Sequence, residues 1–186
     1  MSILTHRGNA RRTALLRLGA LSGLALAGDI PAALAAAKRH AAPALLTSDE
    51  LALTGVLAEL VIPRTQTPGA LDVGAHHTID HLLKSCATTA DQAAFRASLA
   101  RIDTVAGKPF RALPAVRQTA LLRALDSGTA PFTPADLSAF RRLKSYVAFA
   151  YYTSEAGAMR ELAYLPVPGG FKGYVRVTPQ TRTWAI

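Results

Sequence analysis

The chain has 186 residues, half of them hydrophobic and 18% charged, so its length suits one domain with an appendage and its composition excludes a wholly disordered chain. A single cysteine excludes a disulfide scaffold, a two-cysteine redox motif, a zinc ribbon and a four-cysteine iron–sulfur cluster within this chain. The net charge of +9 would suit a nucleic-acid binder, but more than half of the excess lies in residues 1–40, and the mildly basic remainder disfavours nucleic acid as a partner.

Residues 1–37 have the layout of an export signal. A basic stretch ending in Arg11 and Arg12 precedes a weakly apolar run, Thr13 to Gly28, and small residues follow it. Adjacent arginines directly before such a run resemble a twin-arginine signal, which exports folded proteins. The run is too short and too rich in Gly and Ala for a membrane span, which needs about 20 apolar residues. The alternative is an amphipathic helix that stays on the protein.

Residues 38–47 are predicted to be a linker, and a helical domain is predicted to follow. Thr, Ser and Pro occupy capping positions, Pro and Gly mark helix ends, and apolar residues recur between them at helical spacing. The predicted helices cover about 48–62, 76–86, 89–106, 114–125 and 134–155. No run alternates long enough for a sheet, so the fold class is all-α, with about five helices in a small irregular bundle.

The inward faces of these helices follow from the apolar spacing. In the fourth helix the recurring apolar residues are Val116, Leu121, Leu122 and Leu125. Cys86 falls on the apolar side of the second helix, which favours a buried thiol over a bridge to another chain.

The chain changes character at about residue 159. The tail, 159–186, is rich in Pro and Gly and carries aromatic residues without helical or strand periodicity. Such a segment cannot form its own core, so it is expected to be extended and to dock on other surfaces. Docking on the chain's own helices and docking on a partner chain both stay open.

Most chemical motifs are absent from the sequence. It has no glycine-rich phosphate loop and no Gly-x-Ser-x-Gly elbow. The remaining candidate is the cluster His76, His77, Asp80 and His81, in which His77 and His81 are four residues apart and share a helix face. They are weak candidates for a metal site, with Asp80 as a third ligand; the alternative is a polar helix face.

Two segments resemble the gluconate 2-dehydrogenase subunit 3 family. The first is Glu-Leu-Val-Ile-Pro-Arg-Thr-Gln-Thr-Pro-Gly-Ala at 59–70, followed by Val73-Gly74 and Ile79-Asp80. The second is Tyr-Tyr-Thr-Ser-Glu-Ala-Gly-Ala at 151–158, followed by Glu161-Leu162 and by Tyr-Leu-Pro-Val-Pro-Gly-Gly-Phe at 164–171, ending near Trp184. The resemblance covers about 48–186. Arg64 stands where the family often has an acid.

The resemblance implies an accessory role in a periplasmic complex. A large subunit of the glucose–methanol–choline oxidoreductase type would carry FAD and oxidise a sugar or sugar acid, and a cytochrome c subunit with haem c often takes the electrons. The small subunit would have neither cofactor nor catalytic residues, and would escort the folded flavoprotein through the export machinery. The expected partner-binding residues are Tyr151, Tyr152, Glu155, Tyr164, Pro166, Pro168, Phe171, Tyr174 and Trp184. The rival hypothesis is a stand-alone exported enzyme or metal-binding protein that uses the histidine cluster.

Overall fold

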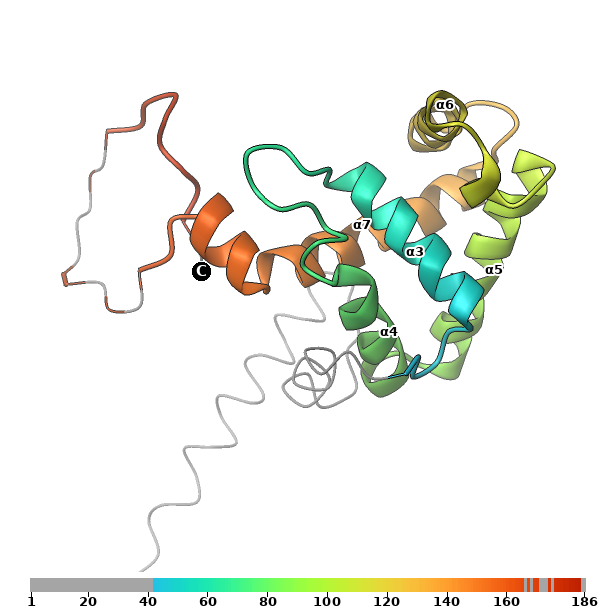
Figure 1. Ribbon diagram of the computed structural model, residues 1–186, viewed down its shortest axis with the longest axis horizontal. Coiled ribbons are helices and arrows are strands. Elements are labelled where there is room, and N and C mark those ends of the chain that lie inside the picture. Colours follow the sequence, from blue (N-terminus) through green and yellow to red (C-terminus); the bar gives the residue numbers. More distant parts are fainter. Residues whose placement is uncertain (1–41, 166, 168, 171–173, 175, 185–186) are drawn as a thin grey trace, which may run out of the picture.

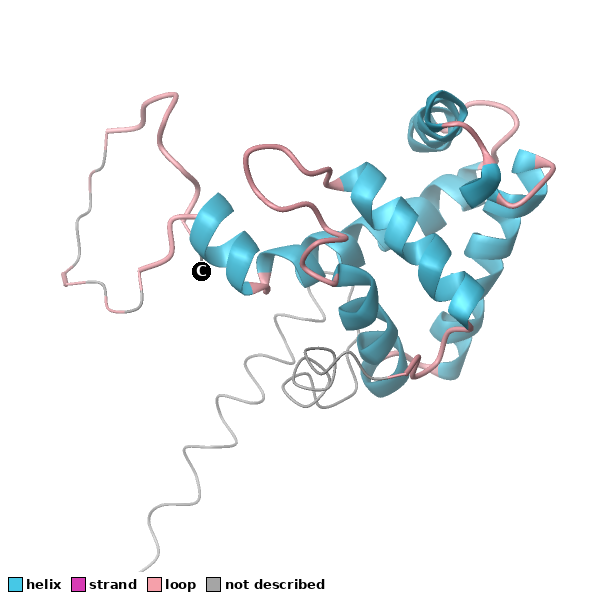
Figure 2. Ribbon diagram, viewed as in Figure 1, coloured by secondary structure: helices cyan, strands magenta, loops and turns pink. Residues whose placement is uncertain are grey.

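The computed structural model describes residues 42–165, 167, 169–170, 174 and 176–184. Within them the chain is helical (Figure 2), which confirms the predicted fold class. The elements are α3 (Ser48–Val61), α4 (Ala75–Cys86), α5 (Thr89–Ala106), the 3-10 turn η1 (Phe110–Ala112), α6 (Ala115–Ser127), α7 (Pro134–Tyr152) and the π-helical turn η2 (Gly157–Glu161). In this part of the chain no helix has both the length and the apolar composition needed to cross a membrane. The predicted export signal, with Arg11 and Arg12, lies outside the described residues.

The helix ends are determined by the local chemistry that the sequence indicated. Thr47 and Thr133 each accept a hydrogen bond from the backbone N–H three residues on, and the acid at that position, Glu50 or Asp136, accepts one in return. α5 ends at Gly107, which adopts the left-handed conformation at φ 71°. These caps place the helix starts within one or two residues of the predicted ones.

The longest helix, α7, is the spine of the bundle and contacts α3, α4, α5 and α6 (Figure 1). α3 and α4 pack against each other and against α7, while α6 packs on α7 at the opposite end of the molecule from η2. The core between the helices is apolar. Its fully buried large side chains are Leu57, Ile79, Leu82, Leu83, Leu99, Phe110, Leu125, Leu143, Val147 and Tyr151.

The prediction that Val116 faces the core is wrong. Val116 is 81% exposed, whereas Leu122 and Leu125 are buried. Nine residues separate Val116 from Leu125, and at 100° per residue this puts the two side chains on opposite faces of α6. Cys86 is buried, as its position on the apolar face of α4 predicted.

The end of α7 also differs from the prediction. The helix was expected to reach about Glu155, but it ends at Tyr152. The hydroxyls of Thr153 and Ser154 donate to the carbonyls of Phe149 and Tyr151, and Ser154 Oγ accepts from the Gly157 N–H. These local bonds compete with the helical ladder, and the chain continues as η2, a turn that the sequence did not predict.

Asp80 joins the start of the described chain to the bundle. Its carboxylate is buried and accepts the backbone N–H groups of Ala44, Leu45 and Leu46, at 2.5, 3.0 and 2.8 Å. The segment before α3 was predicted to be a linker, yet its last residues are held against α4. Leu46 is itself part of the core.

Candidate functional site

The loop between α3 and α4, residues 62–74, is braced by one carboxylate. Glu59 accepts the backbone N–H groups of Arg64 and Leu71, each at 2.9 Å. Gly69 fits against it only because it lacks a side chain, since a Cβ there would lie 2.5 Å from both carboxylate oxygens. The loop therefore has a defined shape although it contains no regular structure.

A second acid fixes the outer part of the same loop. Asp72 forms an ion pair with Arg64 and accepts the Gly69 N–H at 2.9 Å. The hydrogen bond from the Arg64 guanidinium, and next the one from the Gly69 N–H, lower the pKa of Asp72 below its ordinary value. The pair is exposed to solvent, so it orders the loop more than it stabilises the fold.

Two long-range hydrogen bonds attach this loop to the end of α7 and to η2. The hydroxyl of Tyr151 donates to the carbonyl of Pro68 at 2.8 Å, and the hydroxyl of Thr67 donates to the carboxylate of Glu161 at 2.8 Å. Tyr151 is 1% exposed, so the first bond is shielded from water. The two segments that carried the family resemblance, about 80 residues apart, therefore face each other.

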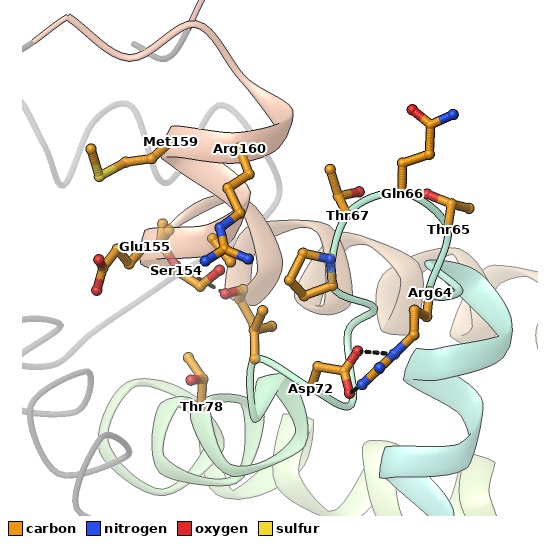
Figure 3. A pocket seen from close by; sticks show the side chains of 15 residues that line it. Arg64, Thr65, Gln66, Thr67, Asp72, Thr78, Ser154, Glu155, Met159 and Arg160 are labelled. Carbon is orange, nitrogen blue, oxygen red and sulfur yellow. Dashed lines mark hydrogen bonds and ion pairs between the residues drawn. The ribbon is translucent and has the colours of Figure 1, made fainter.

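Between these segments lies an open groove of about 1120 Å³ (Figure 3). One wall is the loop, and the other is formed by the end of α7 and by η2. Its lining is mostly polar, and five of the side chains carry a hydroxyl group. These hydroxyl side chains are Thr65, Thr67, Thr78, Thr153 and Ser154.

Two arginines line the groove, and they differ in how their charge is balanced. Arg64 is paired with Asp72. Arg160 extends from η2 into the groove, and its guanidinium has neither an ion pair nor a hydrogen bond with another described residue (Figure 3). Figure 3 shows the Glu155 carboxylate turned away from it. The lining thus contains two arginines and two acids, and Arg160 and Glu155 are the two charged side chains without an ion pair among the described residues.

Exposed apolar side chains gather at the same end of the molecule. We call the following residues the apolar end: Tyr152, Met159, Tyr164, Leu165, Val167, Tyr174, Val177 and Trp184. Among the described residues only Leu71 and Val116 are further large hydrophobics with comparable exposure. Such a concentration on one side of a small chain is typical of a surface that another molecule covers.

The tail is closed at its base and stands apart from the helices. The Ala163 N–H donates to the Thr183 carbonyl at 2.8 Å, and the Arg182 guanidinium donates to the Arg160 carbonyl at 3.0 Å. The described residues between them project beyond η2 (Figure 1), and Tyr174 is 97% exposed. Of the two arrangements left open by the sequence, the described part of the tail does not wrap the bundle.

The predicted partner-binding residues separate into three groups. Tyr152, Glu155, Tyr164, Tyr174 and Trp184 are exposed at the apolar end or beside the groove. Tyr151 is buried, which corrects its expected place on the surface: its ring fills the core and its hydroxyl holds the loop. Pro166, Pro168 and Phe171 lie outside the described residues.

The histidine cluster does not assemble into a metal centre in the described structure. His76, His77, Asp80 and His81 all lie on α4, but Asp80 is engaged by three backbone N–H groups. Among the residues that the structure describes, no three His, Cys, Asp or Glu side chains are placed to hold a metal ion. The predicted candidates His77 and His81 thus lack the third ligand that Asp80 was expected to provide.

Sequence reasoning missed Arg160, Met159 and Thr67 as groove residues. Each belongs to, or directly adjoins, a segment that carried the family resemblance, so the signal was present. What the sequence lacked was the information that these segments meet, because the contacts between Thr67 and Glu161 span 94 residues.

Comparison with known families gives one match. A family model described as gluconate 2-dehydrogenase subunit 3 matches residues 48–169, which is more than half of the chain. The matched region includes both walls of the groove and the start of the tail. Neither the curated proteins nor the solved structures contain a match.

Proposed function

Since the chain belongs to the gluconate 2-dehydrogenase subunit 3 family, as its motifs predicted, we propose that it is the non-catalytic small subunit of a flavin-dependent dehydrogenase. The family is that of an accessory subunit of a dehydrogenase complex. The observation that carries the proposal is the apolar end, whose eight exposed hydrophobic side chains are unusual for a chain that acts alone. Aromatic side chains of this kind supply much of the binding energy at subunit interfaces.

The proposed partner is a large flavoprotein of the glucose–methanol–choline type, which would bind FAD and oxidise a sugar or a sugar acid. The small subunit would contribute no cofactor and would bind and stabilise the flavoprotein. A cytochrome c subunit would take the electrons where the complex contains one. The apolar end supports this role because covering it removes apolar surface from water in both partners.

The proposed location is the periplasm, and the proposed route is twin-arginine export of the folded pair. The support is the sequence of the leader, with Arg11 and Arg12 before an apolar run. Changing both arginines to lysine in the native host should leave the flavoprotein and its dehydrogenase activity in the cytoplasmic fraction. Normal periplasmic activity in this variant would contradict the escort role while leaving the subunit role intact.

The subunit role is tested by recovering the chain from its native host. The full chain, tagged at its C-terminus, is isolated from the periplasmic fraction, and the visible spectrum of the eluate is recorded. We expect a yellow eluate that contains a larger second polypeptide and oxidises a sugar or sugar acid. A colourless eluate containing this chain alone would contradict the proposal, and metal analysis of that eluate would test the histidine cluster.

A further inference from the structure

The groove beside the apolar end is lined by an arginine, Arg160, that is available to bind an anionic group. Arg160 is exposed on η2, and no described acid pairs with it. The neighbouring Arg64 has its own acid, Asp72, whereas the Glu155 carboxylate points away from Arg160 (Figure 3), so Arg160 is the lining arginine that is left without an ion pair. An arginine in this position offers five N–H donors in a rigid planar arrangement, which matches a carboxylate.

The hydroxyls of the groove complement such a ligand. Thr67, Thr153 and Ser154 each donate their hydroxyl hydrogen to a carboxylate or a carbonyl of the chain itself. A hydroxyl oxygen that donates still has lone pairs for accepting. The walls therefore present acceptors for N–H groups around one cationic donor, which suits a polypeptide segment with an acidic side chain.

The walls are also held in place before anything binds. The bonds from Tyr151 to Pro68 and from Thr67 to Glu161 connect them, and Glu59 and Asp72 brace the loop from within. A preformed site loses little conformational entropy on binding. The groove is continuous with the apolar end, because Met159 lines the groove and is exposed beside Arg160.

We propose that the groove between the 62–74 loop and η2 receives an acidic segment of the flavoprotein subunit, with an Asp or Glu side chain paired to Arg160. This inference rests on the proposed function and adds a polar, charge-specific contact beside the apolar end. The apolar end supplies contact area, and the Arg160 pair sets the register and orientation of the two subunits.

The test uses the complex formed by co-expressing the full chain with its flavoprotein. Each complex is diluted serially, and gel filtration monitored by flavin absorbance measures the assembled fraction. Arg160→Glu should weaken assembly by about tenfold or more, and Arg160→Met should make it less sensitive to salt than the wild type. Arg117→Glu on α6, which is also exposed and does not line the groove, is the matched control and should assemble normally.

The outcomes separate the two proposals. If the wild-type chain forms no complex, the proposed function and this inference both fail. If it forms one and Arg160→Glu assembles as well as Arg117→Glu, the groove proposal is overturned and the subunit role stands. As a second measurement, a photoreactive residue in place of Thr65 should cross-link to a flavoprotein peptide that contains Asp or Glu. Cross-linking only to peptides without an acid would also overturn the groove proposal.

Discussion

At the scale of single residues, Asp80 holds the segment before α3 against α4. A buried carboxylate has a high desolvation cost, which here is offset by three backbone N–H donors from residues 44–46. Its position thereby determines where the chain enters the bundle. Asp80 was predicted as a possible metal ligand of the histidine cluster, but in the structure it has this structural role instead.

Replacing Asp80 with Asn should cost about 2 kcal/mol of unfolding free energy, because one carboxylate oxygen becomes an NH₂ group that faces N–H donors. Urea titration of the purified chain, followed by circular dichroism, measures the change. Asp126→Asn is the control: Asp126 is half-exposed and, among the described residues, forms an ion pair with Lys144 alone, so its loss should cost under about 0.5 kcal/mol. Equal stability of the two variants would contradict the role assigned to Asp80.

Gly157 is the residue that allows η2 to follow α7 so closely. A Cβ at this position would lie 2.1 Å from the Tyr151 carbonyl oxygen, well inside contact distance. Gly157→Ala should therefore destabilise the chain by about 1–3 kcal/mol and displace the groove wall that η2 forms. Gly169→Ala is the matched control, since no described atom outside its chain neighbours lies within 4 Å of its added Cβ. Thermal unfolding that does not distinguish the two variants would rule out this packing argument.

At the scale of elements, the start of α7 is stabilised by an acid whose charge state matters. Asp136 accepts the backbone N–H of Thr133 at 2.8 Å and its hydroxyl at 2.9 Å. The backbone hydrogen bond is the main cause that lowers the pKa of Asp136, and the Thr133 hydroxyl and Arg101 lower it further against the effect of burial. A carboxylate with a lowered folded-state pKa stabilises the fold at pH values above its unfolded pKa.

The Asp136→Asn variant should therefore lose about 1 kcal/mol of unfolding free energy at neutral pH. As the pH falls through the folded-state pKa of Asp136, the wild type loses this contribution, so the two stabilities should converge in acid. Urea titrations of both proteins at a series of pH values from neutral to about 2 measure the difference. A difference that is constant across this range would show that the charge of Asp136 is not responsible.

The elements also show which parts of the structure are readable from sequence. The starts of α3, α5 and α7 depend on caps within three residues, so local patterns predicted them. The turns η1 and η2 were missed because, at three and five residues, they are too short to show an apolar period. The groove was missed because its walls meet only in the folded chain: the contact of Tyr151 with Pro68 spans 83 residues. Exposure of the described tail aromatics was not predicted, because the missing periodicity shows only that the tail forms no core of its own and leaves open which surface it contacts.

At the scale of the whole molecule, the residues that form the core and the residues proposed to bind the partner lie mostly in different parts of the structure. The core lies among α3 to α7, while the groove and the apolar end involve η2 and the tail. Most of the described tail residues are exposed. The bond from Ala163 to Thr183 closes the tail on itself, and the Arg182 guanidinium donates to the Arg160 carbonyl of η2. Substitutions in the tail should therefore leave the core intact, as expected of a segment that binds a partner.

This separation predicts that removing the tail affects assembly and leaves folding intact. A chain that ends at residue 168 loses Tyr174, Val177 and Trp184, together with the closure of the tail by Arg182 and Thr183. Its unfolding temperature should stay close to that of the full chain, whereas its complex with the flavoprotein should dissociate at concentrations where the wild-type complex persists.

Gel filtration with flavin detection measures the dissociation of the complex, and Trp184→Ala should also weaken the complex. The control is Val116→Ala, which truncates an exposed apolar side chain of α6 and should assemble normally. A truncated chain that melts early would show that the tail supports the bundle, and one that assembles normally would show that the partner binds elsewhere.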